Sequence, residues 1–289
     1  MNLMLIQTII NGLLVSSVYL IVTLGLSLVL SIMRIVNFAH GEFVMIGAYI
    51  TYWFYTLFKI NPYISLFLCF IILFIIGLFV YKVGINKILD EPSLNQVLLT
   101  FGFSILFQNL ALILWTANAY SLPLKSNPIK LGTIFLSRER LNIFIIGLII
   151  TLLINYILNH TNFGKTLLAI SQNKKAALLV GINVTNYYLL SFGIASGLAG
   201  LAGGLVSFVM YASPFIGVKL GLRAFTIIVL AGLGNINMTI VASLILGLSE
   251  AMISIYLPQG SGWAEGLSFL LILSVLAIKP SGIKGLRTE

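Results

Sequence analysis

Long apolar runs alternate with short polar breaks along almost the whole chain. Boundaries set at charged residues and at Pro- or Asn-rich breaks give nine candidate membrane spans: residues 5–32, 43–58, 63–81, 97–119, 141–158, 187–210, 224–233, 238–257 and 267–278. The runs are continuously apolar instead of alternating at every second residue, so they favour helices over the strands of a membrane barrel. We therefore expect an all-α polytopic membrane protein.

Two of these segments are short for a membrane span. Residues 224–233 offer about ten apolar positions and residues 267–278 about twelve, whereas a straight span needs ~17–25. We expect about eight to nine transmembrane helices, including broken or short helices. Since the spans take up most of the chain, residues 1–289 are expected to form a single transmembrane domain.

The composition agrees with lipid as the main solvent and partner of this chain. Of 289 residues, 60% are hydrophobic and 8% are charged, with a mean hydropathy of +1.10, whereas an average soluble domain is roughly 25% charged. A water-soluble globular protein is therefore excluded. The net charge of +9 comes from basic residues scattered between apolar runs, which indicates anchors at the membrane edges and no nucleic-acid partner.

Motifs of catalysis and metal binding are missing from the sequence. There is no G-x-x-x-x-G-K-[S/T] phosphate loop, and the two histidines, His40 and His160, fit no metal-binding pattern. The single Cys69 lies inside an apolar run, where a small buried hydrophobic residue is the simplest interpretation. We expect no catalytic residue, no metal and no cofactor, and hence no enzymatic activity of the chain by itself.

The orientation in the membrane is predicted from the distribution of Lys and Arg in short loops. The preferred topology places one set of basic residues in the cytoplasm: Arg34, Lys82, Lys87, Lys165, Lys174, Lys175, Lys279, Lys284 and Arg287. The other set then lies outside: Lys59, Lys125, Lys130, Arg138, Arg140, Lys219 and Arg223. Because the two sets are similar in size, the inverted topology stays open on charge alone.

A polar break at residues 37–42 interrupts the apolar sequence between the first two spans and contains Asn37, His40 and Glu42. An ionised side chain at the middle of a bilayer costs ~2.5–3.5 kcal/mol, so such residues face protein or a watery cavity. Asn37 is expected to cap the following helix, with Glu42 in its first turn. Two interpretations remain: a capped helix start at the membrane edge, or a break that borders a translocation pathway.

A second break separates the short segment 224–233 from the next apolar run. Gly232 and Gly234 suit the end of a helix, Asn235 lies within the break, and Asn237 suits the N-cap of the helix that follows. Two such breaks hint at an internal repeat, and the second break is a candidate pathway element. A plain tight turn between two helices is the alternative.

Polar residues also occur inside the predicted spans. Thr100, Ser104 and Gln108 recur at every fourth position and therefore share one helix face, which should face protein or water. Interhelical hydrogen bonding and lining of a pathway both explain this stripe. Glu250 lies within an apolar helix, where it needs a partner or a cavity or must be protonated. Packing near the helix end with a snorkelling carboxylate and a role in the substrate pathway are the two interpretations.

The longest predicted cytoplasmic loop covers residues 159–186. Within it, residues 166–180 are expected to form a short helix that carries Lys174 and Lys175 and ends at Gly181. Apolar and polar residues alternate around this helix, so it can lie on the membrane surface or dock into a partner protein.

Several segments, in order along the chain, resemble a known family. They are IVNFAHGE at 35–42, MIGAY at 45–49, LTFGFS at 99–104 before Gln108, AA at 176–177 with GIN at 181–183, AFT at 224–226 with GLG at 232–234, GLSE at 247–250 and KPSGI at 279–283. Together they resemble the permeases of branched-chain amino acid ABC importers, specifically the LivH type. The resemblance extends over nearly the whole chain.

This resemblance implies a permease subunit of the bacterial inner membrane that imports branched-chain amino acids, or a similar small solute, by ATP-driven alternating access. It implies three kinds of partner: a second related permease, two ATPase subunits that hydrolyse ATP, and an extracytoplasmic substrate-binding protein. The loop at 159–186 is then cytoplasmic and carries the helix that contacts the ATPase, with these coupling candidates: Gly164, Lys165, Ala176, Ala177 and Gly181.

Two other functions remain open at this point. Urea-import permeases share the hallmark block at 35–42, so the solute can differ within the same family. A self-sufficient secondary transporter or channel, with Glu42 and Glu250 as coupling or selectivity groups, is the alternative from another class.

Overall fold

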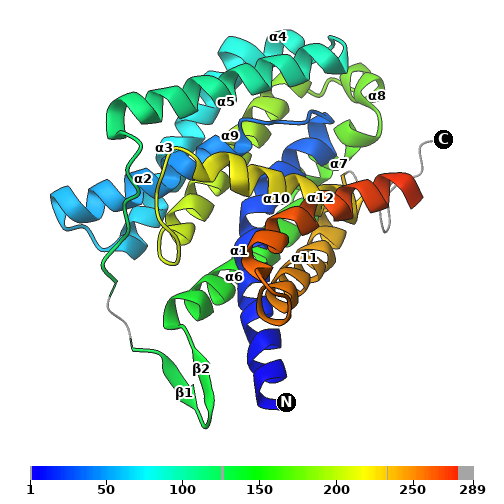
Figure 1. Ribbon diagram of the computed structural model, residues 1–289. Helices are drawn as coiled ribbons and strands as arrows, with labels where there is room; N and C mark the ends of the chain where they lie inside the picture. Colours follow the sequence, from blue (N-terminus) through cyan, green and yellow to red (C-terminus); the bar gives the residue numbers. More distant parts are fainter. Residues whose placement is uncertain (1, 125–126, 233, 279–289) are drawn as a thin grey trace.

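The computed structural model describes residues 2–124, 127–232 and 234–278 (Figure 1). Its helices are α1 (Asn2–Met33), α2 (His40–Phe58), α3 (Pro62–Val80), the π-helical turn η1 (Tyr81–Ile85), α4 (Asn86–Ile88), α5 (Ser93–Trp115), α6 (Arg138–His160), α7 (Asn162–Gln172), α8 (Lys174–Leu179), α9 (Val184–Val206), α10 (Ile216–Ala231), α11 (Ile236–Tyr256) and α12 (Gly260–Ile278).

The protein is a mainly helical polytopic membrane protein, as the apolar pattern predicts. Within the described part of the chain, six helices are long and apolar enough to cross a bilayer: α1, α3 with η1 and α4, α5, α6, α9 and α11. Each of the nine predicted segments overlaps one helix. The count of eight to nine transmembrane helices stays a prediction.

The starts of the two short segments were wrong. α10 begins at Ile216 instead of residue 224, and α12 begins at Gly260 instead of residue 267. Lys219 and Arg223 therefore lie inside α10 and not in an external loop. A charged residue is mistaken for the end of a helix when its charge is neutralised inside the protein. Arg223 is such a case, because it pairs with Glu250.

A small β-hairpin is an exception to the all-α prediction. β1 (Ile129–Leu131) pairs with β2 (Ile134–Leu136) in antiparallel register, with Gly132 at a φ of 62° in the turn between them. The hairpin lies beside the start of α1, where Gln7 Nε2 donates to the Phe135 carbonyl oxygen at 2.8 Å. This small sheet caps one end of the molecule and leaves the helical architecture unchanged.

α1 and α9 form the centre of the bundle. In the most apolar stretch of α1, 83% of the residues are buried. The corresponding share is 78% for α9 and 17% for α5. Small residues on α9 permit close approach: a Cβ added at Gly203 would lie 1.9 Å from the Val44 carbonyl oxygen, and one at Gly47 would lie 2.1 Å from that of Gly200. The stripe of small residues on α9 thus serves helix packing.

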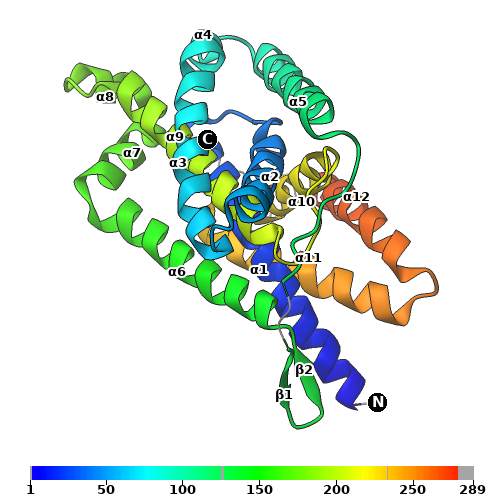
Figure 2. The same ribbon diagram turned by 90° about the vertical axis from the view of Figure 1, so that its left-hand side faces the viewer.

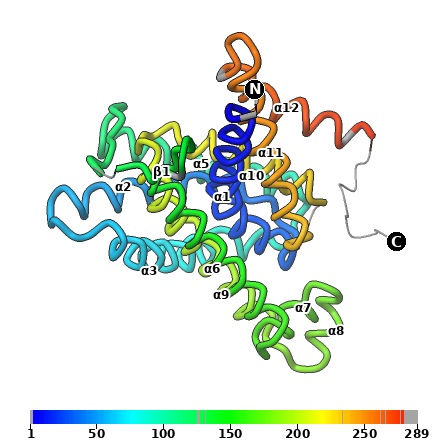
Figure 3. The backbone as a smooth tube through the Cα atoms, turned by 90° about the horizontal axis from the view of Figure 1, so that it is seen from below, coloured from blue at the N-terminus to red at the C-terminus, as the bar shows by residue number. Residues whose placement is uncertain are grey.

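Two helices, and not one, occupy the loop at 159–186, which corrects the prediction for residues 166–180. α7 ends at Gln172, and Asn173 starts α8 by accepting a hydrogen bond from the Ala176 N–H at 2.9 Å. Gly181, at a φ of 83°, lies just after α8 as expected. This pair, the α7–α8 hairpin, projects from the bundle (Figures 2 and 3).

The predicted cytoplasmic residues gather at one end of the molecule. Arg34 Nη2 donates to the Ser171 carbonyl oxygen at 3.4 Å, and Lys174 pairs with Asp90 in the link between α4 and α5. The β-hairpin and the start of α1 lie at the opposite end (Figure 1). Four residues used for the orientation lie outside the described residues: Lys125, Lys279, Lys284 and Arg287.

Candidate translocation site

The break between α1 and α2 is an irregular turn whose backbone is fixed by Asn37. The side chain of Asn37 is buried, and its Oδ1 accepts a hydrogen bond from the Ala39 N–H at 3.1 Å. The prediction that Asn37 is the N-cap of α2 is therefore wrong. That position belongs to Ala39, which makes no side-chain cap bond. Arg34 enters the turn at a φ of 57°, a strained conformation for a residue other than glycine.

His40 connects α2 to α1. Its side chain is buried, and its Nε2 lies 2.8 Å from the Val22 carbonyl oxygen. Since a carbonyl oxygen only accepts, Nε2 carries the proton in this bond. His40 thus has a structural partner that accounts for its position.

Glu42 lies one turn further along α2 and is only partly satisfied. Ser104 Oγ of α5 donates to Glu42 Oε1 at 3.0 Å, but Oε2 is buried with no hydrogen-bond partner among the residues that the structure describes. This oxygen faces the first turn of α10, because a Cβ added at Gly217 would lie 2.5 Å from it. A buried carboxylate with one unpaired oxygen lies where α2, α5 and α10 meet.

The polar stripe of α5 faces protein, as predicted. Thr100 Oγ1 lies 3.3 Å from the Val36 carbonyl oxygen, and Gln108 Nε2 donates to the Pro214 carbonyl oxygen at 3.4 Å. With Ser104, these residues attach α5 to the break before α2 and to the segment before α10. Thr100 and Ser104 are two of the three buried residues of α5, the third being Ala111.

The second break is a tight turn between α10 and α11. Gly232 and Gly234 adopt φ angles of 92° and 87°. Asn235, and not Asn237, is the N-cap of α11, since its Oδ1 accepts from the Met238 N–H at 3.2 Å. Asn237 lies within the helix and is exposed. The geometry favours the tight-turn alternative over a pathway element.

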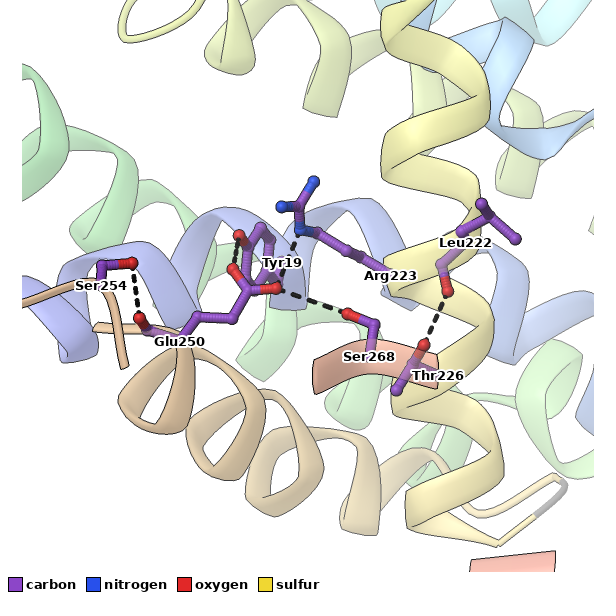
Figure 4. A network of polar contacts seen from close by, with 7 residues as sticks. All are labelled: Tyr19, Leu222, Arg223, Thr226, Glu250, Ser254 and Ser268. Carbon is purple, nitrogen blue, oxygen red and sulfur yellow. Dashed lines mark hydrogen bonds and ion pairs between the residues drawn. The ribbon is translucent and has the colours of Figure 1, made fainter. Parts of the chain in front are cut away.

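Glu250 lies in a buried polar network that the sequence did not predict (Figure 4). Arg223 Nε of α10 pairs with Glu250 Oε1 at 3.0 Å, and the Tyr19 hydroxyl of α1 donates to Oε2. Ser268 of α12 lies 3.5 Å from Oε1. The carboxylate is buried between four helices, so the snorkelling alternative was wrong.

The predicted coupling residues divide into buried and exposed groups. Gly164 and Ala177 are buried, and a Cβ at Gly164 would lie 2.1 Å from the Ile157 carbonyl oxygen, so both serve packing of the α7–α8 hairpin. Lys165, Ala176 and Gly181 are exposed. Leu179 and Val180 are 88% and 75% exposed, and this apolar tip of α8 carried no signal in the sequence beyond its amphipathic pattern.

Three residues that complete these sites, Arg223, Tyr19 and Gly217, were not predicted from the sequence. Arg223 was placed in a loop, Tyr19 was one of many aromatic residues in apolar runs, and Gly217 gave no signal of its contact with Glu42. Such pairings join residues far apart in the chain, and a single sequence does not contain that information. No group of three or more His, Cys, Asp or Glu residues able to hold a metal ion occurs among the described residues.

A family model described as "Branched-chain amino acid transport system / permease component" matches residues 8–276. The chain is 28% identical to the high-affinity branched-chain amino acid transport system permease protein LivH of Salmonella typhimurium and to BraD of Pseudomonas aeruginosa, each over 96% of this chain and 95% of the relative.

A probable LivH permease of Methanocaldococcus jannaschii is 27% identical over 93% of this chain and 89% of that protein. No solved structure matches the chain. The apolar helices, the hallmark block at 35–42 and the match over residues 8–276 all agree. The chain belongs to the family of permease components of branched-chain amino acid transport systems.

Proposed function

We propose that this chain is a permease subunit of an ATP-driven ABC importer and carries branched-chain amino acids inward by alternating access. It works in the bacterial inner membrane with eight or nine membrane-crossing helices. Its partners are a second related permease, two ATPase subunits and an extracytoplasmic substrate-binding protein. The chain itself catalyses no reaction, and ATP is hydrolysed by the ATPases.

The observation that carries this proposal is the half-satisfied carboxylate of Glu42. A membrane-buried ionisable group with an unpaired oxygen is costly unless it serves a solute or ion. Ser104 holds one oxygen of Glu42 at 3.0 Å, and Gln108 lies further along the same face of α5. These three side chains offer hydrogen-bond partners that replace part of the water lost by a zwitterion.

The α7–α8 hairpin supports a role in coupling. Its exposed apolar tip at Leu179 and Val180 offers a surface for a groove on an ATPase. Arg34, which contacts Ser171 of α7, stands three residues before Asn37. Movement of the hairpin would therefore reach the break before α2 through a short connection.

Transport is tested with the full complex in proteoliposomes. Leucine uptake should require ATP and the binding protein, and should be inhibited by isoleucine and valine. Uptake driven by a proton or sodium gradient without ATP would support a secondary transporter instead. Inhibition by urea with no inhibition by amino acids would identify a urea permease of the same family.

Coupling is tested at the tip of α8. Leu179→Glu places a charge on an exposed apolar position and should reduce both ATPase co-purification and ATP-driven uptake, while the protein remains inserted. A control must change the charge at an exposed position without disturbing the apolar surface of the helices. Leu153→Glu does not meet this condition, because Leu153 lies on the apolar surface of α6. Asn162→Glu at the start of α7 is the matched control, since it adds the same charge at an exposed position away from the tip. Unchanged co-purification of Leu179→Glu would contradict the proposed docking.

A further inference from the structure

A cavity of about 440 Å³ lies where the α7–α8 hairpin meets the helical bundle. This volume is within the range of roughly 300–1,000 Å³ that cavities for small ligands occupy. Its lining comes from four parts of the chain: the end of α1 with Arg34, the α4–α5 link with the first turn of α5, the segment that joins α7 to α8, and Tyr188 of α9. We call it the hairpin cavity.

The charged side chains of the hairpin cavity are mainly basic. Arg34, Lys174 and Lys175 line it, and the acidic side chain of the lining is Asp90. Lys174 and Asp90 form an ion pair with each other. Arg34 and Lys175 form no ion pair within the part of the chain that the structure describes. The cavity therefore carries two positive charges without a counter-ion among the described residues.

Tyr188 adds a buried hydroxyl group to the lining. The residue is 5% exposed, and its hydroxyl has no hydrogen-bond partner within residues 2–124, 127–232 and 234–278. The charges of Asp90 and Arg34 both act on this hydroxyl, so it lies near the charged part of the lining. A buried hydroxyl without a partner lowers the stability of a folded protein. Its position in a basic cavity points to a bound group that accepts a hydrogen bond from it.

Arg34 offers several donors at the edge of the cavity. It adopts a φ of 57° directly after α1, and its Nη2 donates to the Ser171 carbonyl oxygen at 3.4 Å, a long hydrogen bond. A guanidinium group has five N–H donors in a planar fork, and within the described structure this bond uses one of them. The others are available to a second acceptor.

We propose that the hairpin cavity binds a phosphate group. Its oxygens match the donors that the cavity leaves without a partner: the guanidinium fork of Arg34, the ammonium group of Lys175 and the hydroxyl of Tyr188. In the predicted orientation the cavity lies at the cytoplasmic edge of the membrane. Two sources of this chemistry occur there, the headgroup of an anionic phospholipid and a soluble phosphate. The proposal goes beyond the transport function and does not depend on the solute that is carried.

A phosphate group in the hairpin cavity would join three parts of the molecule. Arg34 follows α1, Tyr188 belongs to α9 and Lys175 belongs to α8. α1 and α9 form the centre of the bundle, whereas α8 projects from it (Figure 2). We therefore expect binding to hold the α7–α8 hairpin against the central helices.

Thiol labelling at the rim of the cavity tests its occupancy in the full complex. Gln172 is exposed and lines the cavity, so Gln172→Cys combined with Cys69→Ala gives the permease a single reactive thiol. Labelling by N-ethylmaleimide is followed on the permease band, which keeps the partner subunits out of the signal. Inorganic phosphate or an anionic lipid should slow this labelling in a saturable way, whereas sodium chloride at the same ionic strength should not.

Two kinds of vesicle distinguish the source of the phosphate group. Slower labelling in vesicles of phosphatidylcholine with phosphatidylglycerol than in vesicles of phosphatidylcholine alone, with no phosphate added, identifies a lipid headgroup. Slower labelling on addition of inorganic phosphate in phosphatidylcholine vesicles identifies a soluble phosphate. Either result supports the proposal.

Tyr188→Phe separates a ligand site from a structural cavity. It removes a hydroxyl that has no partner in the described structure, so Tm without the ligand should be unchanged or higher. Protection should then need roughly tenfold more ligand, the effect of losing one hydrogen bond to a charged group. Tyr187→Phe is the matched control, because Tyr187 is next along α9, stacks on Phe163 and does not line the cavity. Lys175→Gln should also weaken protection, and Lys87→Gln, at an exposed lysine outside the lining, should not.

Three results would overturn the proposal. The first is labelling that neither phosphate nor phosphatidylglycerol slows more than sodium chloride does. The second is equal protection of Tyr188→Phe and Tyr187→Phe, which would trace the effect to phosphate bound by the ATPase subunits. The third is slow labelling of Gln172→Cys in phosphatidylcholine vesicles that phosphate leaves unchanged, which would mean that a partner subunit covers the cavity. None of these measurements requires transport, so their outcome is separate from that of the proposed function.

Discussion

Among the helical side chains that the structure describes, two glutamates are buried, and they differ in how their carboxylates are satisfied. Glu250 has an ion pair with Arg223 and a hydrogen bond from Tyr19, so both of its oxygens have partners. Glu42 has one hydrogen bond from Ser104 and one oxygen with no partner in the described structure. The two residues have similar burial, 5% and 1% exposed.

Under the proposed function, this difference separates a structural role for Glu250 from a transport role for Glu42. A buried charge whose partners come from several helices fixes their arrangement, and Glu250 joins α1, α10, α11 and α12. A buried carboxylate with a free oxygen keeps a binding position for another group. Four predictions test whether the two sites differ in this way.

The largest effect is expected from Arg223→Met, which leaves Glu250 buried without its cation. Breaking a buried ion pair on one side costs ~3–5 kcal/mol, so we expect a large fall in folded yield and in Tm, measured in detergent. The double variant Arg223→Met with Glu250→Met removes both charges at similar volume and should regain most of the yield. Equal yields of the single and double variants would contradict the structural role.

A smaller effect is expected where α10 crosses α2 next to Glu42. Gly217→Ala places a methyl group 2.5 Å from Glu42 Oε2 and 2.9 Å from the Gly41 carbonyl oxygen, and overpacking of this kind costs ~1–3 kcal/mol. Both Tm and uptake should fall. Gly221→Ala on the same helix is the control, because its Cβ would lie 3.5 Å from Gly41 Cα, an ordinary contact. Equal behaviour of the two variants would show that Glu42 is not tightly seated.

The smallest effect on stability is expected on the α5 side of Glu42. Ser104→Ala removes a hydrogen bond to α2, and Gln108→Leu removes one to the segment before α10. An interhelical hydrogen bond in a membrane protein contributes ~0.6 kcal/mol on average. Tm should therefore change little, whereas leucine uptake per inserted complex should fall. Asn109→Leu, at an exposed position whose side chain bonds only within α5, is the control. If Gln108→Leu transports normally, the stripe serves helix packing alone.

The helical fold follows from the sequence to a large extent. Apolar runs long enough to span a bilayer predict helices with little ambiguity, because lipid allows no unpaired backbone. The pattern failed at α10, since Lys219 and Arg223 looked like the polar end of a loop. It also joined α7 and α8, because the polar residues Gln172 and Asn173 fit an amphipathic helix as well as a helix boundary.

The candidate site could be predicted only in part. Glu42, Ser104 and Glu250 stood out because polar groups in apolar runs are costly. Their partners did not, since Ser104 lies 62 residues from Glu42 and Arg223 lies 27 from Glu250. Tyr188 of the hairpin cavity gave no signal, because aromatic residues are common in membrane helices and its lack of a partner among the described residues is visible only after folding.

The most direct test of the difference between the two glutamates is to compare Glu42→Gln with Glu250→Gln in the same complex, measuring Tm and ATP-driven leucine uptake per folded molecule. Glutamine at 42 can still accept from Ser104, so we expect an unchanged Tm and uptake lowered roughly tenfold or more through loss of the charged partner. Glutamine at 250 removes the negative charge that pairs with Arg223, so we expect a lower Tm with near-normal uptake by the molecules that fold. Normal uptake by Glu42→Gln, or lost uptake with unchanged Tm in Glu250→Gln, would contradict this account.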